Sequence, residues 1–145
     1  MTFVIPNEVS KVGAYCFYSS KVATILKRVV LPNGLPEIGE YAFANCYNLS
    51  SIFLSSGLKV INSYAFSACR SLGLITIPAT VDNIGKNVFY GCTTLSYVSL
   101  ENYEGWNYKK SDGTLVEISF KDLSNPVGAK DCFILYNGSY PWVRI

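Results

Sequence analysis

A sequence repeat that runs from the first residues to position 100 constrains the fold of this chain more than any other feature. Its clearest markers are four phenylalanines, separated by 26, 23 and 23 residues: Phe17, Phe43, Phe66 and Phe89. A cysteine follows each of the last three at an interval of three residues, and a leucine at an interval of six. Apolar residues precede each phenylalanine by 5, 8, 12 and 14 residues. Such regular columns are typical of solenoid proteins, in which each repeat forms one turn of a coil.

The apolar spacing changes within each repeat. The first half has apolar residues two positions apart, as in Ile75-Thr76-Ile77, which predicts a strand. The second half, Ile38 to Cys46, has intervals of 4, 1 and 3, which predict a short turn of helix with one face inward. Glycine recurs in one column at Gly13, Gly39 and Gly85, so we expect a tight corner with left-handed backbone there.

One repeat cannot bury its own apolar side, but stacked repeats can. In a stack, strand lies beside strand at about 4.8 Å, and each apolar column becomes a continuous ladder. We therefore predict an α/β solenoid over residues 1–100, a right-handed coil of about 4 to 5 repeats of roughly 23 residues.

The repeat resembles a known family. The pattern Ile-Pro, Val, Ile-Gly, Phe, Cys and Leu, as found in residues 77–95, is similar to the BspA-like leucine-rich repeat. The resemblance covers residues 3–100 and is weakest in the first repeat, which has Ser20 in the cysteine column and Ala23 in the leucine column. It implies a bacterial or protozoan protein at the cell surface or outside the cell, with an adhesive or matrix-binding role. It supplies no catalytic residues.

Residues 101–145 leave the repeat pattern and are expected to form an α+β cap, because a solenoid must cover its last core layer. Residues 106–109 and 114–118 flank Asp112-Gly113, which predicts a β-hairpin. Ser124-Asn125-Pro126 predicts the start of a helix that runs to about residue 136, and residues 140–144 predict a closing strand. The aromatic residues expected to be buried in this cap are Trp106, Phe133 and Trp142.

Composition argues against several classes of function. The chain has no histidine, which excludes histidine acid–base catalysis and histidine metal ligands. Its 12 basic and 10 acidic residues give a net charge of +2, too balanced for a nucleic-acid binder. No apolar run reaches the ~18 residues that span a bilayer, so we expect no membrane insertion in this segment. The carboxylates form no recognisable pair, so we expect neither an enzyme nor a cofactor or metal.

The five cysteines contain no Cys-x-x-Cys pair: Cys16, Cys46, Cys69, Cys92 and Cys132. Three of them share the column after the phenylalanines, where small apolar side chains pack between coils. We expect those three to be free thiols in a packed ladder rather than a metal or disulfide site.

Candidate binding residues are the strand positions that point away from the core. On a leucine-rich repeat this is the concave face, and it includes several large apolar side chains. The positions selected by this reasoning are Arg28, Val30, Phe53, Leu74, Thr76 and Tyr97. A second column, Tyr15, Tyr41 and Tyr64, is expected on the opposite side, where packing is favoured over ligand contact.

Two functions are consistent with these patterns. The first is a non-enzymatic, adhesion-type module that binds a protein or glycan ligand on a host or neighbouring cell. The alternative is a structural C-terminal end-piece of a longer repeat protein whose binding residues lie upstream. The alternative is suggested by Phe3 and Ile5, which already belong to the repeat, so the first coil has no cover of its own. We also expect that copies of the chain can associate end to end through this first coil.

Overall fold

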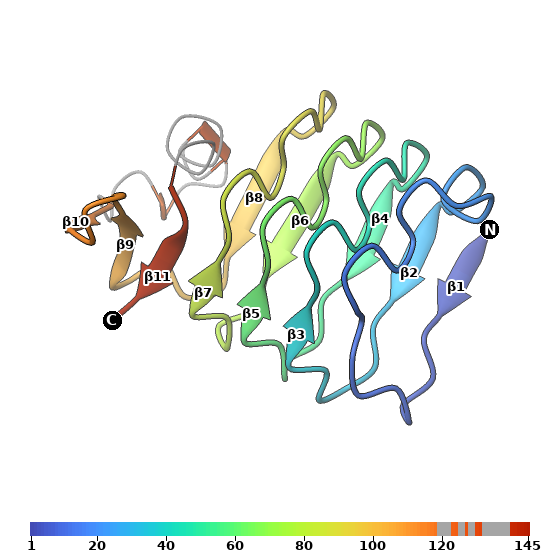
Figure 1. The fold of residues 1–145 in the computed structure, drawn as a ribbon, viewed down its shortest axis with the longest axis horizontal. Coiled ribbons are helices and arrows are strands. Elements are labelled where there is room, and N and C mark those ends of the chain that lie inside the picture. Colours follow the sequence, from blue (N-terminus) through green and yellow to red (C-terminus); the bar gives the residue numbers. More distant parts are fainter. Residues whose placement is uncertain (119–122, 125–126, 128–129, 132–139) are drawn as a thin grey trace.

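The computed structural model describes residues 1–118, 123–124, 127, 130–131 and 140–145. Residues 1–100 wind into a β-solenoid of about four turns, shown in Figure 1 with the coils side by side. One side of the coil consists of five strands: β1 (Thr2–Val4), β2 (Arg28–Val30), β4 (Ser51–Phe53), β6 (Leu74–Ile77) and β8 (Tyr97–Leu100). The other side has three short strands: β3 (Glu37–Ile38), β5 (Val60–Ile61) and β7 (Asn83–Ile84).

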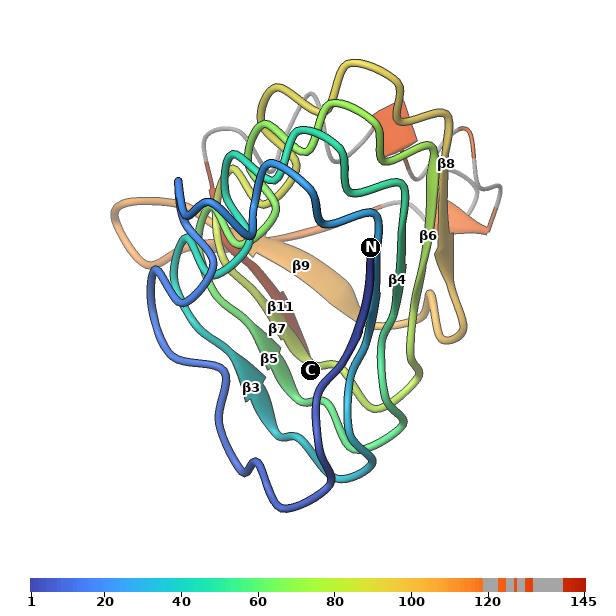
Figure 2. The same cartoon turned by 90° about the vertical axis from the view of Figure 1, so that its right-hand side faces the viewer.

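The coils are stacked in the register that the repeat predicts. Val29 pairs with Ile52 between β2 and β4, and Ile75 pairs with Val98 between β6 and β8, both in parallel. On the other side, Ile61 pairs with Ile38 and with Ile84. Figure 2 shows the two sets of strands facing each other across the interior. The predicted strands and their columns are therefore confirmed.

The short helical turn expected in the second half of each repeat is not confirmed. Residues 37–38 form a two-residue strand instead, and residues 40–45 form consecutive turns. The predicted inward face is nevertheless correct, because Ile38, Phe43 and Cys46 are fully buried. The spacing indicates only which side chains face the core. A run of turns can direct those side chains inward as well as a helix can.

The interior is organised around a ladder of phenylalanine rings. Ring centroids are 5.0 Å apart for Phe17 and Phe43, 5.6 Å for Phe43 and Phe66, and 5.9 Å for Phe66 and Phe89. The interplanar angles are 9° to 11°, so the rings lie almost parallel. An aromatic pair of this kind contributes about 0.5–1.5 kcal/mol beyond the burial of its area. Each ring therefore binds its own coil to the next.

The left-handed corner is not at the glycine column. Positive φ angles occur two residues later, at Tyr15, Tyr41 and Tyr64 (φ 53° to 58°) and at Asn87 (φ 56°). The glycines serve a different purpose, which is the close approach of neighbouring coils. A Cβ at Gly85 would clash with the backbone of the preceding coil at residues 62–63.

The C-terminal segment folds back against the last coil. The predicted hairpin is confirmed as β9 (Trp106–Lys109) paired with β10 (Leu115–Glu117). The predicted closing strand is confirmed as β11 (Trp142–Arg144), which lies antiparallel between β7 and β9. This extends the second side of the solenoid to the order β10-β9-β11-β7-β5-β3.

The cap buries its tryptophans as expected. Trp106 and Trp142 are almost fully buried, with ring centroids 6.2 Å apart. The expected helix over residues 126–136, with Phe133, falls largely outside the described residues, so the α+β character of the cap stays a prediction.

The close approach at Gly85 has a matched control in the chain. Adding a methyl group through Gly85→Ala forces two coils apart, so we expect a loss of about 1–3 kcal/mol or more in the free energy of unfolding. Gly13 occupies the same column but has nothing within 4 Å of its missing Cβ, so Gly13→Ala should stay within about 0.5 kcal/mol of wild type. Chemical denaturation of both variants measures the difference, and equal stabilities would contradict this packing.

Candidate functional site

All six candidate binding residues lie on the strands of the first side of the solenoid. Phe53, Leu74 and Tyr97 are more than half exposed, whereas their neighbours Ile52 and Ile75 point into the core. The remaining candidates differ in exposure: Arg28 and Thr76 are exposed, and Val30 is partly buried.

The register places these side chains beside one another. Val30 pairs with Phe53, and Leu74 pairs with Tyr97. The guanidinium of Arg28 lies over the Phe53 ring, 5.7 Å from its centroid, which is within cation–π range. The six residues therefore form one largely apolar surface that also carries the Thr76 hydroxyl and the positive charge of Arg28.

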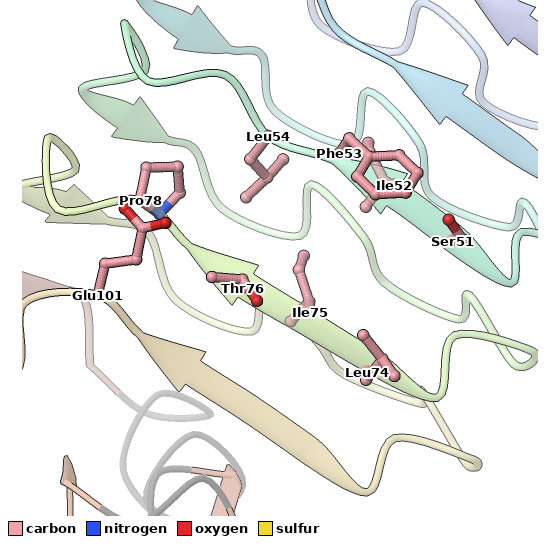
Figure 3. A pocket seen from close by; sticks show the side chains of 9 residues that line it. All are labelled: Ser51, Ile52, Phe53, Leu54, Leu74, Ile75, Thr76, Pro78 and Glu101. Carbon is pink, nitrogen blue, oxygen red and sulfur yellow. The ribbon is translucent and has the colours of Figure 1, made fainter.

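A break in the sheet crosses the middle of this surface. The first side of the solenoid is a three-stranded sheet, β1-β2-β4, followed by a separate pair, β6-β8. A groove of about 250 Å³ lies between β4 and β6, and Figure 3 shows its side chains. It is lined by Ser51, Ile52, Phe53, Leu54, Leu74, Ile75, Thr76, Pro78 and Glu101. We call this groove the seam.

The walls of the seam carry unpaired backbone groups. Phe53 directs its carbonyl to β2, where it accepts a hydrogen bond from the Leu31 amide at 3.3 Å. Ile77 directs its carbonyl to the Glu101 amide, on the β8 side, at 3.0 Å. Alternate residues of a parallel strand form their backbone hydrogen bonds to opposite sides. The backbone N–H and C=O groups of Ile52 and of Thr76 therefore point into the seam from its two walls. Among the described residues, no backbone hydrogen bond joins β4 to β6.

The sequence identified only part of the seam. Phe53, Leu74 and Thr76 were selected, while Arg28, Val30 and Tyr97 lie outside its lining. Six lining residues are not among the candidates: Ser51, Ile52, Leu54, Ile75, Pro78 and Glu101. Glu101 accepts a hydrogen bond from the Ala79 amide at 3.0 Å and supplies the seam's carboxylate. No sequence signal marks the seam itself, because it depends on where strand pairing stops between β4 and β6.

The tyrosine column forms a stack on the turns of the coil. Ring centroids are 5.0 Å apart for Tyr15 and Tyr41 and 4.7 Å for Tyr41 and Tyr64. In the next coil Asn87 replaces the ring, and its side-chain amide donates to the Tyr64 hydroxyl at 2.8 Å. Partial burial raises the pKa of Tyr41. Because each ring covers the face of the next, the column is a packing ladder, as the sequence favoured.

The cysteine column is buried and bound to the backbone of the preceding coil. The thiol of Cys69 donates to the Phe43 carbonyl at 3.2 Å, and that of Cys92 donates to the Phe66 carbonyl at 3.1 Å. Burial raises the pKa of Cys46 and of Cys92 to about 12, and it raises the pKa of Cys69 as well. A thiol in this state is a poor nucleophile and a poor metal ligand.

Metal clusters and membrane-spanning helices were sought in the part of the chain that the structure describes. There, no group of three or more histidine, cysteine, aspartate or glutamate side chains is arranged to hold a metal ion. Within the same residues, no helix has the length and apolar character needed to cross a bilayer.

Comparison with protein families agrees with this architecture. The model of the BspA type leucine rich repeat region matches residues 1–108, in six copies. The chain belongs to this BspA-type family. Comparison with curated proteins found no match.

Solved structures similar to this chain come from several bacteria. A leucine-rich repeat protein from Bacteroides capillosus is 32% identical with a TM-score of 0.60, and the match covers 70% of this chain and 77% of that one. The T. pallidum leucine-rich repeat protein is 28% identical with a TM-score of 0.56, covering 68% and 58%. The pneumococcal vaccine antigen PcpA is 29% identical with a TM-score of 0.62, covering 72% and 25%.

The matched length differs between these relatives. The similar region spans about half of the T. pallidum protein and a quarter of the pneumococcal antigen. Both of those chains therefore contain long segments that have no counterpart in the matched region.

The buried thiols lead to a test of the cysteine ladder. At pH 8, a thiol with a pKa of about 12 is ionised in about one molecule in ten thousand, so Cys46 and Cys92 should react with a thiol reagent only after unfolding. Exposed Cys16 should react at once. Because the fold favours the protonated thiols, their contribution to stability is present below about pH 9 and is lost as the pH rises towards 12.

The measurement uses a Cys132→Ser background, so that the fast phase belongs to Cys16 alone. Adding Cys16→Ser should then abolish the fast phase. Mass spectrometry of the unfolded, unreduced protein should find Cys46, Cys69 and Cys92 without a bridge between any two. A bridge, or fast labelling of these three in the folded protein, would overturn the ladder.

Proposed function

We propose that this chain is a non-enzymatic binding module of a cell-surface or secreted protein, and that its ligand contacts the first side of the solenoid around the seam. The observation that carries this proposal is the position of the exposed apolar residues. Phe53 and Leu74 stand on either side of a groove whose walls carry unpaired backbone donors and acceptors. Such a surface combines apolar anchors with polar groups that fix orientation, as binding sites do.

The composition of the surface supports binding rather than catalysis. The seam holds one carboxylate, that of Glu101, and none of the other residues that line it has an acidic or basic side chain. The candidate residues offer rings, methyl groups and a guanidinium instead. With no histidine in the chain, a proton-transfer pair has no support in this sequence.

The ligand that we propose is a protein or a glycan on a host or neighbouring cell. Aromatic and arginine side chains are the residue types that most often supply binding energy at interfaces, and Arg28 lies over Phe53 in this surface. The relation to a pneumococcal vaccine antigen supports a location at the cell surface or outside the cell.

A second proposal is that the chain is a structural end-piece of a longer repeat protein. It is favoured by the first coil, where Phe3 is partly buried against the core and β1 pairs on one side only, with β2. Further repeats, or a second copy in an end-to-end contact, would cover that strand. The coding sequence upstream of Met1 decides between the two, because a contiguous run of repeats favours the end-piece.

The binding surface is tested with a double variant, Phe53→Ser with Leu74→Ser. Because both side chains are largely exposed, the melting temperature should change little, while binding to ligands found on an array of matrix proteins and glycans should weaken at least tenfold. Tyr90→Ser is the matched control, since Tyr90 is 68% exposed and lies outside the surface. Equal binding by the double variant and the control would contradict the proposal.

A further inference from the structure

A second recess lies on the second side of the solenoid, where the C-terminal segment folds back on the last coil. Its volume is about 350 Å³, and three of the residues that line it are lysines: it is formed by Lys86, Lys109, Lys110, Ser111, Tyr140 and Pro141. We call it the lysine recess. Nothing in the repeat pattern requires lysine at any of these positions, because each of the three side chains is exposed and none belongs to the core.

The fold brings these lysines together from distant parts of the sequence. Lys86 follows β7, and Lys109 ends β9; β11 lies between these two strands and pairs with both (Figure 1). A backbone hydrogen bond also holds the lining of the recess together, because the Lys109 amide donates to the Pro141 carbonyl at 2.9 Å. The lysine recess therefore exists only when the C-terminal segment has folded back on the last coil.

None of the three lysines forms a salt bridge in the described part of the chain. The ion pair found there joins Lys130 to Asp131. Asp112 lies in the hairpin turn near Lys110, but its carboxylate accepts the Thr114 amide at 2.8 Å. Hydrogen bonds from Thr114, and then the charge of Lys110, lower the pKa of Asp112. Like charges that converge on one hollow repel each other and produce a positive potential that attracts an anion.

The rest of the lining suits a sugar. The Tyr140 ring stacks on Tyr108 with centroids 5.3 Å apart, so it is held in place as a rigid wall. Ser111 adds a hydroxyl group. An aromatic ring can pack on a pyranose ring, and a hydroxyl group can form hydrogen bonds with the sugar hydroxyls.

We propose that the lysine recess binds an acidic glycan, with its sulfate or carboxylate groups held by Lys86, Lys109 and Lys110. Lysine presents a compact point charge that suits a sulfate oxygen, whereas bidentate recognition of planar acids is the property of arginine. A hollow with aromatic and hydroxyl walls favours a sugar chain over a flat membrane. The net charge of +2 and the small size of the basic cluster argue against nucleic acid.

The proposal is tested with dextran sulfate as the probe and uncharged dextran as its neutral counterpart. The triple variant Lys86→Gln, Lys109→Gln, Lys110→Gln should bind dextran sulfate at least tenfold more weakly than wild type. A charge-matched control, Lys11→Gln, Lys21→Gln, Lys27→Gln, removes three exposed lysines from the first coils and should bind as wild type does. The corresponding triple change to arginine should retain binding, and raising the salt concentration should weaken it.

Several results would overturn the proposal. One is an equal loss of binding in the two triple Lys→Gln variants, which would mean that dextran sulfate responds to the net charge of the protein and not to the lysine recess. Another is wild-type binding to phosphatidylserine vesicles or poly-glutamate as tight as binding to dextran sulfate, which would assign the lysine recess to a lipid or acidic protein. The Phe53→Ser, Leu74→Ser variant should bind dextran sulfate normally, so failure here and failure of the seam as a binding surface are distinguishable.

Discussion

The in-register stacking of phenylalanine rings is the interaction on which the rest of this structure depends. Each repeat contributes one ring, and the rings of Phe43, Phe66 and Phe89 lie nearly parallel between successive coils. A coil therefore has its core completed only by its neighbours, which is why no single repeat could fold alone. The same 23-residue offset aligns Ile38, Ile61 and Ile84 on the second side, so both sides of the coil obey one register.

This tight stacking has two consequences for the backbone. Neighbouring coils approach so closely that Gly85 has no room for a side chain, and the turn after it needs a left-handed residue. The chain uses tyrosine at three of these left-handed positions, although the conformation costs roughly 1–2 kcal/mol for most residues. The stacked rings of Tyr15, Tyr41 and Tyr64 offset that cost, since each pair of rings adds a packing interaction.

Much of the fold could be predicted from the sequence, because the regular spacing of Phe, Cys and Leu identifies the columns of core residues. Two errors share one cause. The second half of the repeat was expected to be a helical turn, and Gly39 and Gly85 were expected at left-handed corners, because spacing and residue type do not report distances between coils. The sequence does not predict the seam or the lysine recess, for a related reason. The seam depends on where strand pairing stops between β4 and β6. The lysine recess depends on β11, which joins the strands next to Lys86 and Lys109.

The central claim is that the phenylalanine ladder sets the register of the coils, and NMR can test it directly. With ring-labelled phenylalanine in the otherwise unchanged chain, nuclear Overhauser contacts should connect Phe43 to Phe66 and Phe66 to Phe89, because their ring centroids are 5.6 and 5.9 Å apart. No contact should connect Phe43 to Phe89, since Phe66 lies between them. Absence of the two neighbour contacts, or a direct contact between Phe43 and Phe89, would contradict the stacked register and the solenoid built on it.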